Sequence, residues 1–345
     1  MAMAESSLSD PITPICSICI ANYNGLEIIA DCIESVLAQD CGFPIEIIVH
    51  DDASTDGSAE LIRHRFPQIQ LIESKTNVGF CISNNRMAAI ASGTYLLLLN
   101  NDATLMPGAL ATLLQHAAAI GGPAILTLPQ YNAQTGALID AGCFLDPFLN
   151  PVPNLDLKQK DVGMVIGACL WIPKTLWDRI DGFPEWFGSI AEDLYLCCVA
   201  RLWGYRVVAL ADSGYLHAIG YSFGGGKADK KQLTLSKKRR RLSERNKNIA
   251  MLLCYPVAML ALLLPLHSLL LVVEGLIFSL AKGRKDIFTD IYWNSLKSLW
   301  LDKSRISDKR QEVQRGRVAS LRTFMSVHTC YPQKLRLLFE YGLPR

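Results

Sequence analysis

Ile47-Ile48-Val49-His50-Asp51-Asp52-Ala53-Ser54-Thr55-Asp56-Gly57 reads as a hydrophobic strand that ends in a pair of aspartates. A second hydrophobic run, Tyr95 to Leu99, ends in Asn100-Asn101-Asp102. The carboxyl ends of parallel strands meet at one edge of an open α/β sheet, and ligands bind at that edge. We therefore expect the functional site where these two acidic strand ends come together.

The surrounding sequence alternates strand and helix patterns. Runs rich in β-branched residues predict strands at 15–21, 45–50, 69–73 and 94–99, then at 124–128, 137–144, 164–172 and 206–210. Apolar residues at helical spacing predict helices at 25–38 and 80–91, and three prolines indicate a loop at 146–161. The βαβ order favours a largely parallel sheet in an α/β fold.

Charge divides the 345-residue chain into two parts. Residues 1–226 hold ten Lys and Arg against twenty-three Asp and Glu, whereas residues 227–345 hold twenty-four against nine. We expect a catalytic domain over 1–226 and a basic, apolar helical region over 227–345. The eleven scattered cysteines fit a reducing cytosol better than a disulfide framework.

The basic part contains a segment that favours a membrane surface over nucleic acid. The polybasic run 237–241 leads into an uncharged apolar run, 249–273, which is long enough to span a bilayer. Prolines interrupt that run, and a single span would leave Lys and Arg clusters on both sides of the membrane. We expect interfacial or shallow re-entrant helices on the cytoplasmic side, with no signal peptide at residues 1–10. A Leu-rich subdomain buried against the first domain or a second copy is the alternative.

The turn after the first strand argues against a dinucleotide cofactor. It reads Ala21-Asn22-Tyr23-Asn24-Gly25, and this single glycine cannot replace the Gly-x-Gly-x-x-Gly turn that NAD and FAD require. A nucleotide bound without that turn is implied. Asp51 and Asp52 would then contact its ribose or base, although Asp in this position can also cap a helix.

Two other acidic motifs have candidate chemistry. Asp102 at a strand end can coordinate Mg²⁺ or Mn²⁺ carrying a diphosphate, or it can cap the helix near Pro107. Glu192 and Asp193 open a predicted helix, whose dipole would keep a carboxylate ionised and ready to act as a general base. Simple dipole complementation is the alternative for this pair.

The order of the three acidic motifs resembles the inverting family 2 glycosyltransferases of GT-A fold, over residues 13–225 and more loosely beyond. The resemblance implies a Rossmann-like mixed sheet with a C-terminal membrane-associated helical tail. It implies Asp193 as the base beside Glu192, and Asp102 with His217 as metal ligands, although a histidine such as His217 can also be purely structural. It further implies that the nucleotide sugar contacts Ala21, Tyr23, Asn24, Asp51, Asp52, Asn77, Gly79, Asn84, Asn100 and Asn101.

Three departures and one further likeness refine the resemblance. Asn100 stands where the family has the first Asp of its Asp-x-Asp metal motif, and Ala21 stands where proline is usual. The Gln-x-x-Arg-Trp motif of processive synthases is absent after His217, which favours one sugar per encounter. The segment 243–246 looks like the rhamnosyltransferase-like branch, whose members build bacterial surface polysaccharides on membrane lipid carriers.

The function implied by this resemblance is transfer of a sugar, rhamnose for example. The donor would be a nucleoside diphosphate sugar, the acceptor a hydroxyl of a glycan or polyprenyl-linked substrate, and Mg²⁺ or Mn²⁺ would assist. Two alternatives stay open. One is a membrane-bound nucleotide-sugar-binding protein without transfer activity, and the other is a nucleotidyltransferase, although a Gly-rich loop with Arg and Lys is missing near residues 17–25.

Overall fold

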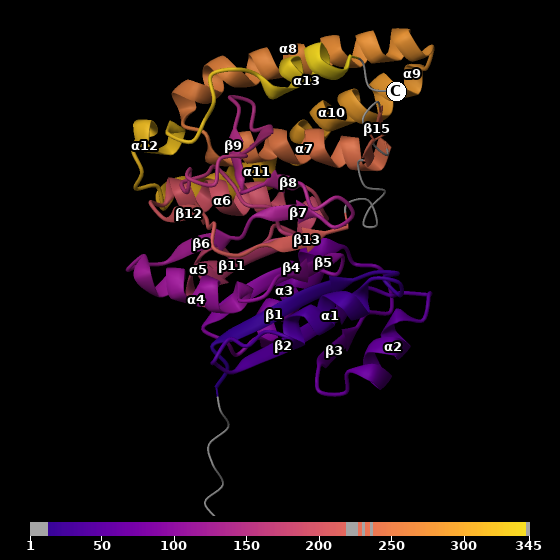
Figure 1. Cartoon of the computed structure of the whole chain (residues 1–345). Coiled ribbons are helices and arrows are strands. Elements are labelled where there is room, and N and C mark those ends of the chain that lie inside the picture. The colour runs from indigo at the N-terminus through magenta and orange to yellow at the C-terminus, as the bar shows by residue number, and fades with distance from the viewer. Residues whose placement is uncertain (1–12, 219–226, 230–231, 235–236, 343–345) are drawn as a thin grey trace, which may run out of the picture.

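The structure is a computed structural model that describes residues 13–218, 227–229, 232–234 and 237–342. Its centre is a seven-stranded sheet (Figure 1). In spatial order the strands are β12 (Arg206–Ala209), β6 (Ala124–Thr127), β11 (Cys169–Pro173), β4 (Tyr95–Asn100), β1 (Cys16–Asn22), β2 (Ile45–Asp51) and β3 (Gln70–Glu73). The sheet is parallel except at β11, which runs antiparallel to β4 and β6. The predicted mixed α/β sheet is confirmed.

Helices bury both faces of this sheet because the strands are apolar on both sides. On one face, Ile18, Ile20 and Leu97 pack with residues of α1 (Ile29–Leu37), α2 (Ser58–Arg65) and α4 (Ala109–Ala119). On the other, Cys19 and Leu98 pack with α3 (Phe80–Ile90), α5 (Lys174–Ile180) and α6 (Glu192–Leu202). This sandwich fixes the strand ends that carry the acidic motifs.

A smaller sheet lies beside the carboxyl end of β4. It contains, in spatial order, β5 (Ala103–Leu105), β13 (Tyr215–His217), β7 (Gln130–Asn132) and β8 (Leu138–Asp140). Two hairpins are separate: β9 (Cys143–Leu145) with β10 (Pro151–Pro153), and β14 (Lys227–Asp229) with β15 (Gln232–Thr234). Pairing of β13 with β5 brings His217 opposite Ala103, the residue after Asp102.

Three sequence predictions need correction in this region. The strand predicted over 137–144 is broken into β8 and β9, because the chain bends at Gly142, where φ is +68° and a Cβ would lie 2.9 Å from the Val162 side chain. The strand predicted over 164–172 begins only at Cys169, because the backbone turns at Ile166, whose carbonyl accepts the Cys169 N–H. The loop predicted over 146–161 includes β10.

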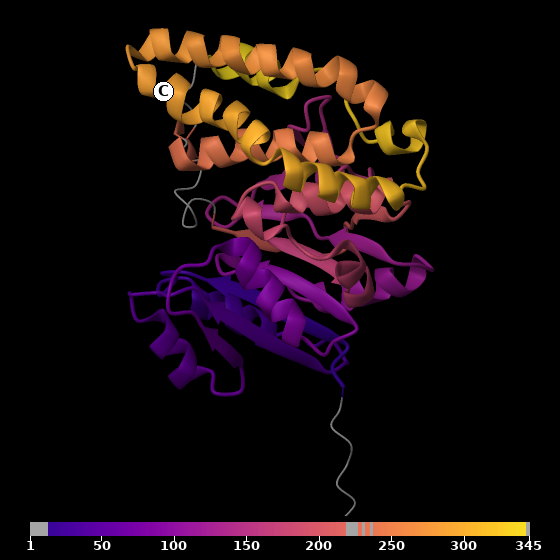
Figure 2. The same ribbon diagram turned by 180° about the vertical axis from the view of Figure 1, so that it is seen from behind.

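The C-terminal part is a helical layer over one end of the molecule (Figures 1 and 2). Its helices are α7 (Lys237–Cys254), α8 (Val257–Lys282), α9 (Lys285–Ile287), η2 (Phe288–Trp293), α10 (Asn294–Leu301), α11 (Lys303–Arg315), α12 (Leu321–Met325) and α13 (Gln333–Tyr341). The short helix η1 (Glu185–Phe187) lies earlier in the chain and precedes α6. The expected domain boundary at residue 226 falls at the edge of a stretch outside the described residues, and it stays a prediction.

The apolar run 249–273 is divided into two helices, as its interrupting prolines indicated, but its first part is not the interfacial helix that was expected. Pro256 separates α7 from α8. The part before this break, including Ile249, Met251 and Leu253, is fully buried in the core that also contains α6. This part of the run is protein core, as the buried-subdomain alternative predicted, because it faces other protein elements on all sides.

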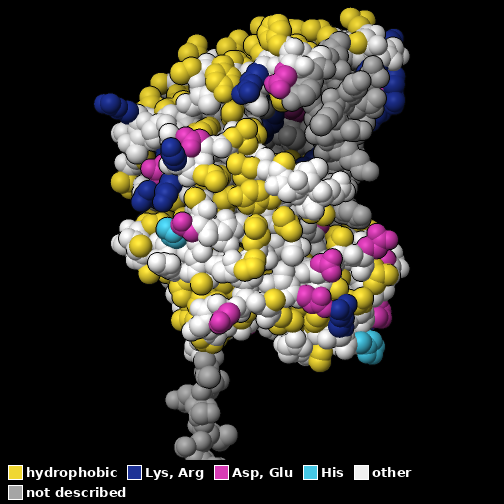
Figure 3. Space-filling model, viewed as in Figure 1, with side chains coloured by type: hydrophobic (Ala, Val, Ile, Leu, Met, Phe, Trp, Pro, Cys, Tyr) yellow, Lys and Arg dark blue, Asp and Glu magenta, His cyan; other side chains and the backbone are white. Residues whose placement is uncertain are grey.

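Only α8 has the length and composition of a membrane-spanning helix among the described residues. Its 26 residues extend roughly 39 Å. One side packs on η2 through Leu271 and Phe278. The opposite side exposes large apolar side chains, with Leu262 exposed by 70% and Leu280 by 82%. Figure 3 shows hydrophobic side chains gathered over this end of the molecule.

Candidate functional site

The carboxyl ends of β1, β2 and β4 meet through the side chain of Asn22. Its Nδ2 donates to Asp51 Oδ1 at 2.8 Å and to Ser58 Oγ at 2.9 Å, while its Oδ1 accepts from Asn101 Nδ2 at 2.9 Å. The β1–β2 register places Asn22 directly opposite Asp51. Asn22 was not among the predicted site residues, although its position at the end of the first strand is the signal that identifies it.

The aspartate pair divides into two structural tasks. Asp51 accepts from Asn22 and from the Ser54 N–H, and so joins β1 to the turn after β2. Asp52 accepts the Val78 N–H at 2.6 Å and the Gly79 N–H at 2.9 Å. Both carboxylates therefore hold backbone around the site, and only Asp52 reaches its wall.

A cavity of about 1070 Å³ brings the predicted site residues together. All of the predicted site residues line this cavity except Asp51 and Asn84. The Asn84 Nδ2 donates a hydrogen bond to the Phe80 carbonyl instead. The predicted residues on its wall are Ala21, Tyr23, Asn24, Asp52, Asn77, Gly79, Asn100, Asn101, Asp102, Glu192, Asp193 and His217. Residues separated by up to 196 positions in sequence thus share one chamber, and the contact of each with a ligand stays a prediction.

Asp102 and His217 form the candidate metal site. His217 Nε2 lies 3.0 Å from Asp102 Oδ1, and both side chains are largely buried. His217 Nδ1 lies 2.7 Å from Gln130 Nε2, and the Gln130 Oε1 in turn accepts the Tyr215 hydroxyl at 3.0 Å. The Gln130 amide thus fixes the orientation of the His217 ring beside Asp102.

The chemistry of this pair fits a divalent cation that a substrate helps to hold. Within the described residues, no group of three or more His, Cys, Asp and Glu side chains could hold a metal on its own. Mg²⁺ and Mn²⁺ complete their coordination with water and phosphate oxygens, so one carboxylate and one imidazole suffice beside a diphosphate. Asn100, on the same wall, adds an amide oxygen but no charge.

Glu192 and Asp193 lie at the N-terminus of α6, where the chain reaches the cavity through Ala191 at φ +67°. Asp193 Oδ2 accepts the Gly167 N–H at 3.0 Å, and its Oδ1 accepts the Leu194 N–H at 2.7 Å. Glu192 Oε2 is buried without a hydrogen-bond partner in the described part of the chain. Both oxygens of Asp193 thus accept a backbone N–H, whereas the Oε2 of Glu192 accepts none from the described residues.

Burial changes the protonation of this pair relative to the sequence prediction. The helix dipole was expected to keep a carboxylate here ionised, but burial raises the pKa of Asp193, and burial with the Asp193 charge raises the pKa of Glu192 to about 8. Desolvation of a carboxylate outweighs the dipole here. Of the two carboxyls, Asp193 is the one whose negative charge is stabilised, because both of its oxygens accept a backbone N–H.

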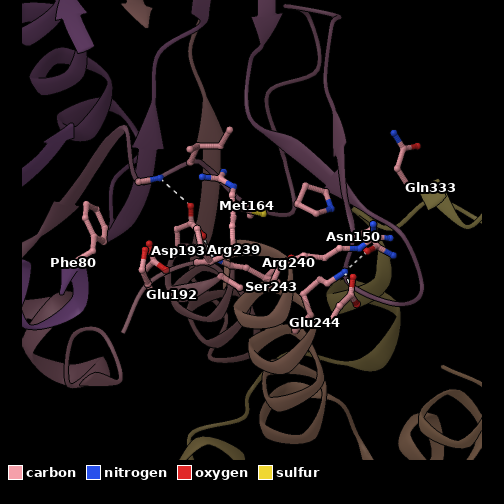
Figure 4. A pocket seen from close by; sticks show the side chains of 18 of the residues that line it. Phe80, Asn150, Met164, Glu192, Asp193, Arg239, Arg240, Ser243, Glu244 and Gln333 are labelled. Carbon is pink, nitrogen blue, oxygen red and sulfur yellow. Dashed lines mark hydrogen bonds and ion pairs between the residues drawn. The ribbon is translucent and has the colours of Figure 1, made fainter. Parts of the chain in front are cut away.

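The helical layer contributes charged residues to the cavity, although their basic sequence predicted contact with membrane lipid headgroups. Arg239 and Arg240 of α7 line the cavity, and the positive charge of Arg239 opposes the pKa rise of Glu192 and Asp193. Figure 4 shows Arg239 and Arg240 between the Glu192–Asp193 pair and Glu244. The sequence did contain a sign that α7 presents charged residues to a site, because the spacing of Arg240, Glu244 and Lys247 places them on one helix face.

Comparison with known proteins identifies the domain that holds this cavity. Residues 17–178 match the family described as Glycosyl transferase family 2. The chain carries a family 2 glycosyltransferase domain. The match supports the GT-A fold for this domain and a reaction of the sugar-transfer class, and it identifies neither the donor nor the acceptor. It favours sugar transfer over nucleotidyl transfer.

Relatives of this glycosyltransferase domain include mycobacterial proteins. N-acetylglucosaminyl-diphospho-decaprenol L-rhamnosyltransferase of Mycobacterium tuberculosis is 25% identical over 211 residues, which are 52% of this chain and 69% of that protein. An uncharacterised M. tuberculosis protein is 33% identical over 105 residues, which are 30% of this chain and 33% of its own length. This chain therefore matches only about a third of one relative and about two thirds of the other.

The solved structure of GalNAc-T7 with UDP, GalNAc and Mn²⁺ has a similar fold. It superposes with a TM-score of 0.63 at 14% sequence identity, over 97% of this chain and 59% of that one. At this identity the likeness concerns the fold alone. The similarity of fold therefore extends beyond residues 17–178.

Proposed function

We propose that this enzyme transfers a sugar with inversion, from a nucleoside diphosphate sugar to a hydroxyl of a lipid-linked glycan acceptor in cell-surface polysaccharide biosynthesis. The observation that carries this proposal is the shared cavity, which joins Asp102 and His217 to the Glu192–Asp193 pair. A donor diphosphate beside the first pair would direct its sugar toward the second. The donor sugar is rhamnose in the proposal, because the named relative is an L-rhamnosyltransferase.

In the proposed reaction Asp193 takes the proton from the acceptor hydroxyl. The hydroxyl oxygen forms a bond to the anomeric carbon while the bond from that carbon to the phosphate oxygen breaks on the opposite side, so configuration inverts and the nucleoside diphosphate leaves. The Gly167 and Leu194 N–H groups orient the Asp193 carboxylate. Glu192, which keeps its proton at neutral pH, adds no second charge beside the base.

Asp102 and His217 would hold Mg²⁺ or Mn²⁺ in this proposal. A bound divalent cation supplies positive charge that stabilises the departing diphosphate. The similar GalNAc-T7 structure contains UDP and Mn²⁺, which supports both the metal and the donor class. Asn100 leaves this chain with one carboxylate fewer than the family pattern, so we expect the donor diphosphate to contribute much of the metal affinity.

The exposed side of α8 supports a location at the cytoplasmic membrane surface. Its outer leucines offer an apolar stripe, while Glu274 and His267 of the same helix face inward and are largely buried. A helix with one apolar and one charged side suits the plane of the interface better than the bilayer centre. Both ends of α8 then stay on one side, close to a lipid-linked acceptor.

The replacement Asp193→Asn tests the assigned base. Donors of several bases and sugars, including rhamnose, are first screened by thermal shift with Mn²⁺ or Mg²⁺, since a ligand of the folded state raises its stability. For a donor that binds, we expect D193N to reduce transfer by about 10²- to 10⁴-fold and to keep donor binding within about twofold. Asp178→Asn, on an exposed side chain of α5, is the control.

Asn100 also favours a second candidate, a nucleotide-sugar-binding protein without transfer activity, because it weakens the metal motif. The same experiment separates the two functions. Donor binding without transfer or hydrolysis by the wild-type chain would establish the binding protein. Equal turnover by D193N and the wild type would refute the base assignment.

A further inference from the structure

The cavity continues from Asp193 into a second region beneath α8 and α13 that the proposed reaction does not use. Apolar side chains form its walls, among them Leu271, Val273 and Ile277 of α8 and Leu335 and Leu338 of α13. Leu271 is buried, whereas Ile277 is 47% exposed and Leu338 is 40% exposed. The region therefore begins inside the molecule and reaches the outer apolar surface of the helical layer.

Charged groups lie between this apolar region and the Glu192–Asp193 pair. Lys334 Nζ is 2.8 Å from a carboxylate oxygen of Glu244 and 2.8 Å from one of Glu274, and Arg240 pairs with Glu274 at 2.7 Å. Lys247 pairs with Glu244 at 3.2 Å. Three cations thus face two carboxylates, and the cluster keeps one excess positive charge that an anion can neutralise.

Unpartnered polar atoms in the same place also indicate a missing ligand. His267, which is 2% exposed, has no hydrogen-bond partner for Nε2 in the described chain, and Gln333, 7% exposed, has none for Oε1. Both residues line the cavity. Burial lowers the pKa of His267 to about 3, so the ring is a neutral hydrogen-bonding group. Buried polar atoms without partners are costly. A bound phosphate oxygen would accept the His267 Nε2–H, and a hydroxyl of an attached sugar would donate to Gln333 Oε1.

We propose that this region binds the lipid end of the acceptor: its phosphate groups at the Arg240–Lys247–Lys334 cluster, and the first apolar units of its lipid between α8 and α13. The inference rests on the proposed function and adds the location of the acceptor. Figure 4 places Arg240, Glu244 and Gln333 on the same pocket as Asp193, so a sugar attached to the phosphate can extend toward the base.

The order of chemical environments along the cavity favours this occupant. Figure 4 places Arg239 and Arg240 beside the base Asp193, with Glu244 beyond them, and the apolar walls of α8 and α13 include exposed side chains such as Ile277 and Leu338. A sugar, a phosphate and a hydrocarbon chain follow one another in the same order in a lipid-linked acceptor. The hydrocarbon chain of the acceptor could then pass from the cavity into the bilayer without crossing a polar surface.

Alkyl diphosphates of two lengths test the proposal without knowledge of the acceptor sugar. Ethyl diphosphate and undecyl diphosphate, kept below its micelle concentration, are titrated into the full chain by calorimetry. We expect the undecyl compound to bind at least thirtyfold more tightly, because each buried methylene adds affinity. Equal affinity of the two compounds would overturn the lipid part of the proposal.

Two neighbouring residues of α13 provide a matched pair of variants. Leu338→Asp places a carboxylate in the apolar wall and should weaken undecyl diphosphate binding by about tenfold while leaving ethyl diphosphate unchanged. Phe339→Asp, on a side chain 88% exposed that does not line this cavity, should change neither. If F339D weakens the binding of undecyl diphosphate as much as L338D does, the alkyl chain binds the outer surface of α13 and the proposed location is wrong.

Lys334→Gln tests the phosphate end, with folding checked by thermal unfolding. It should weaken both compounds by the same factor, since both carry the same diphosphate, and unchanged affinity would overturn the cationic site. Donor turnover by the wild type and by F339D, whose side chain does not line the cavity, separates the two hypotheses. If both turn over donor but the binding results fail, only the acceptor location is wrong, whereas absence of wild-type turnover refutes the proposed function and this inference with it.

Discussion

The replacement Glu192→Gln should make the stability of the protein less dependent on pH. The pKa of Glu192 rises from its usual 4.5 to about 8, through burial and through the Asp193 charge. Between these values the folded protein keeps a proton that the unfolded chain releases, so the free energy of unfolding falls as pH rises. At 1.36 kcal/mol per pKa unit, the loss totals about 5 kcal/mol above pH 8, of which about 3 kcal/mol falls between pH 5.5 and 8.5.

Urea unfolding of the wild type and E192Q at pH 5.5 and 8.5 measures this effect. Glutamine keeps the shape of the protonated glutamate and cannot ionise, so E192Q should be more stable than the wild type, and its advantage should grow by about 3 kcal/mol from the lower to the higher pH. Glu185→Gln, on an exposed side chain of η1, should show no such growth. An equal pH dependence in E192Q and the wild type would refute the buried, protonated state of Glu192.

Three further predictions follow from contacts in the structure. Asn100→Asp restores a second carboxylate at the candidate metal site, and it should lower the Mn²⁺ concentration for half-maximal transfer by about tenfold in a metal titration. Asp52→Asn removes the carboxylate that accepts the Val78 and Gly79 N–H groups. The free energy of unfolding in urea should fall by about 2 kcal/mol, and the KM for the donor should rise. Both ring nitrogens of His328 are buried without a hydrogen-bond partner among the described residues, and burial lowers the pKa of the ring from 6.5 to about 4. The wild type should therefore lose about 3 kcal/mol as pH falls from 7 to 4, and unfolding of His328→Phe should lack this loss.

The strand ends of the catalytic domain could be predicted because local sequence determines them. β1, β2 and β4 are short apolar runs, and each ends where a polar residue begins, at Asn22, Asp51 and Asn100. Side-chain periodicity and the βαβ order then suffice to place these ends at one edge. The twelve predicted residues on the cavity wall follow from this simple geometry and from the family resemblance.

The remaining features depend on tertiary structure that the sequence does not show directly. Hydropathy alone does not distinguish Ile249, which lies in a protein core, from Leu262, which is exposed on α8. Lys334 meets Glu244 across 90 residues, and no local pattern indicates that contact. The raised pKa of Glu192 likewise results from its burial and from the Asp193 charge, which together outweigh the helix dipole that the sequence does reveal.

Because the two sides of α8 have different neighbours, the solubility of the protein can be changed by mutation without changing the walls of its cavity. The outer side chains Leu262, Leu269 and Leu280 are exposed and do not line the cavity, so polar replacements there would leave its walls intact. A chain with serine or glutamate at these three positions should stay dispersed in aqueous buffer at concentrations suited to crystallisation. The same helix would still close the chamber over Asp193, so such a protein is a practical route to an experimental complex with donor and metal.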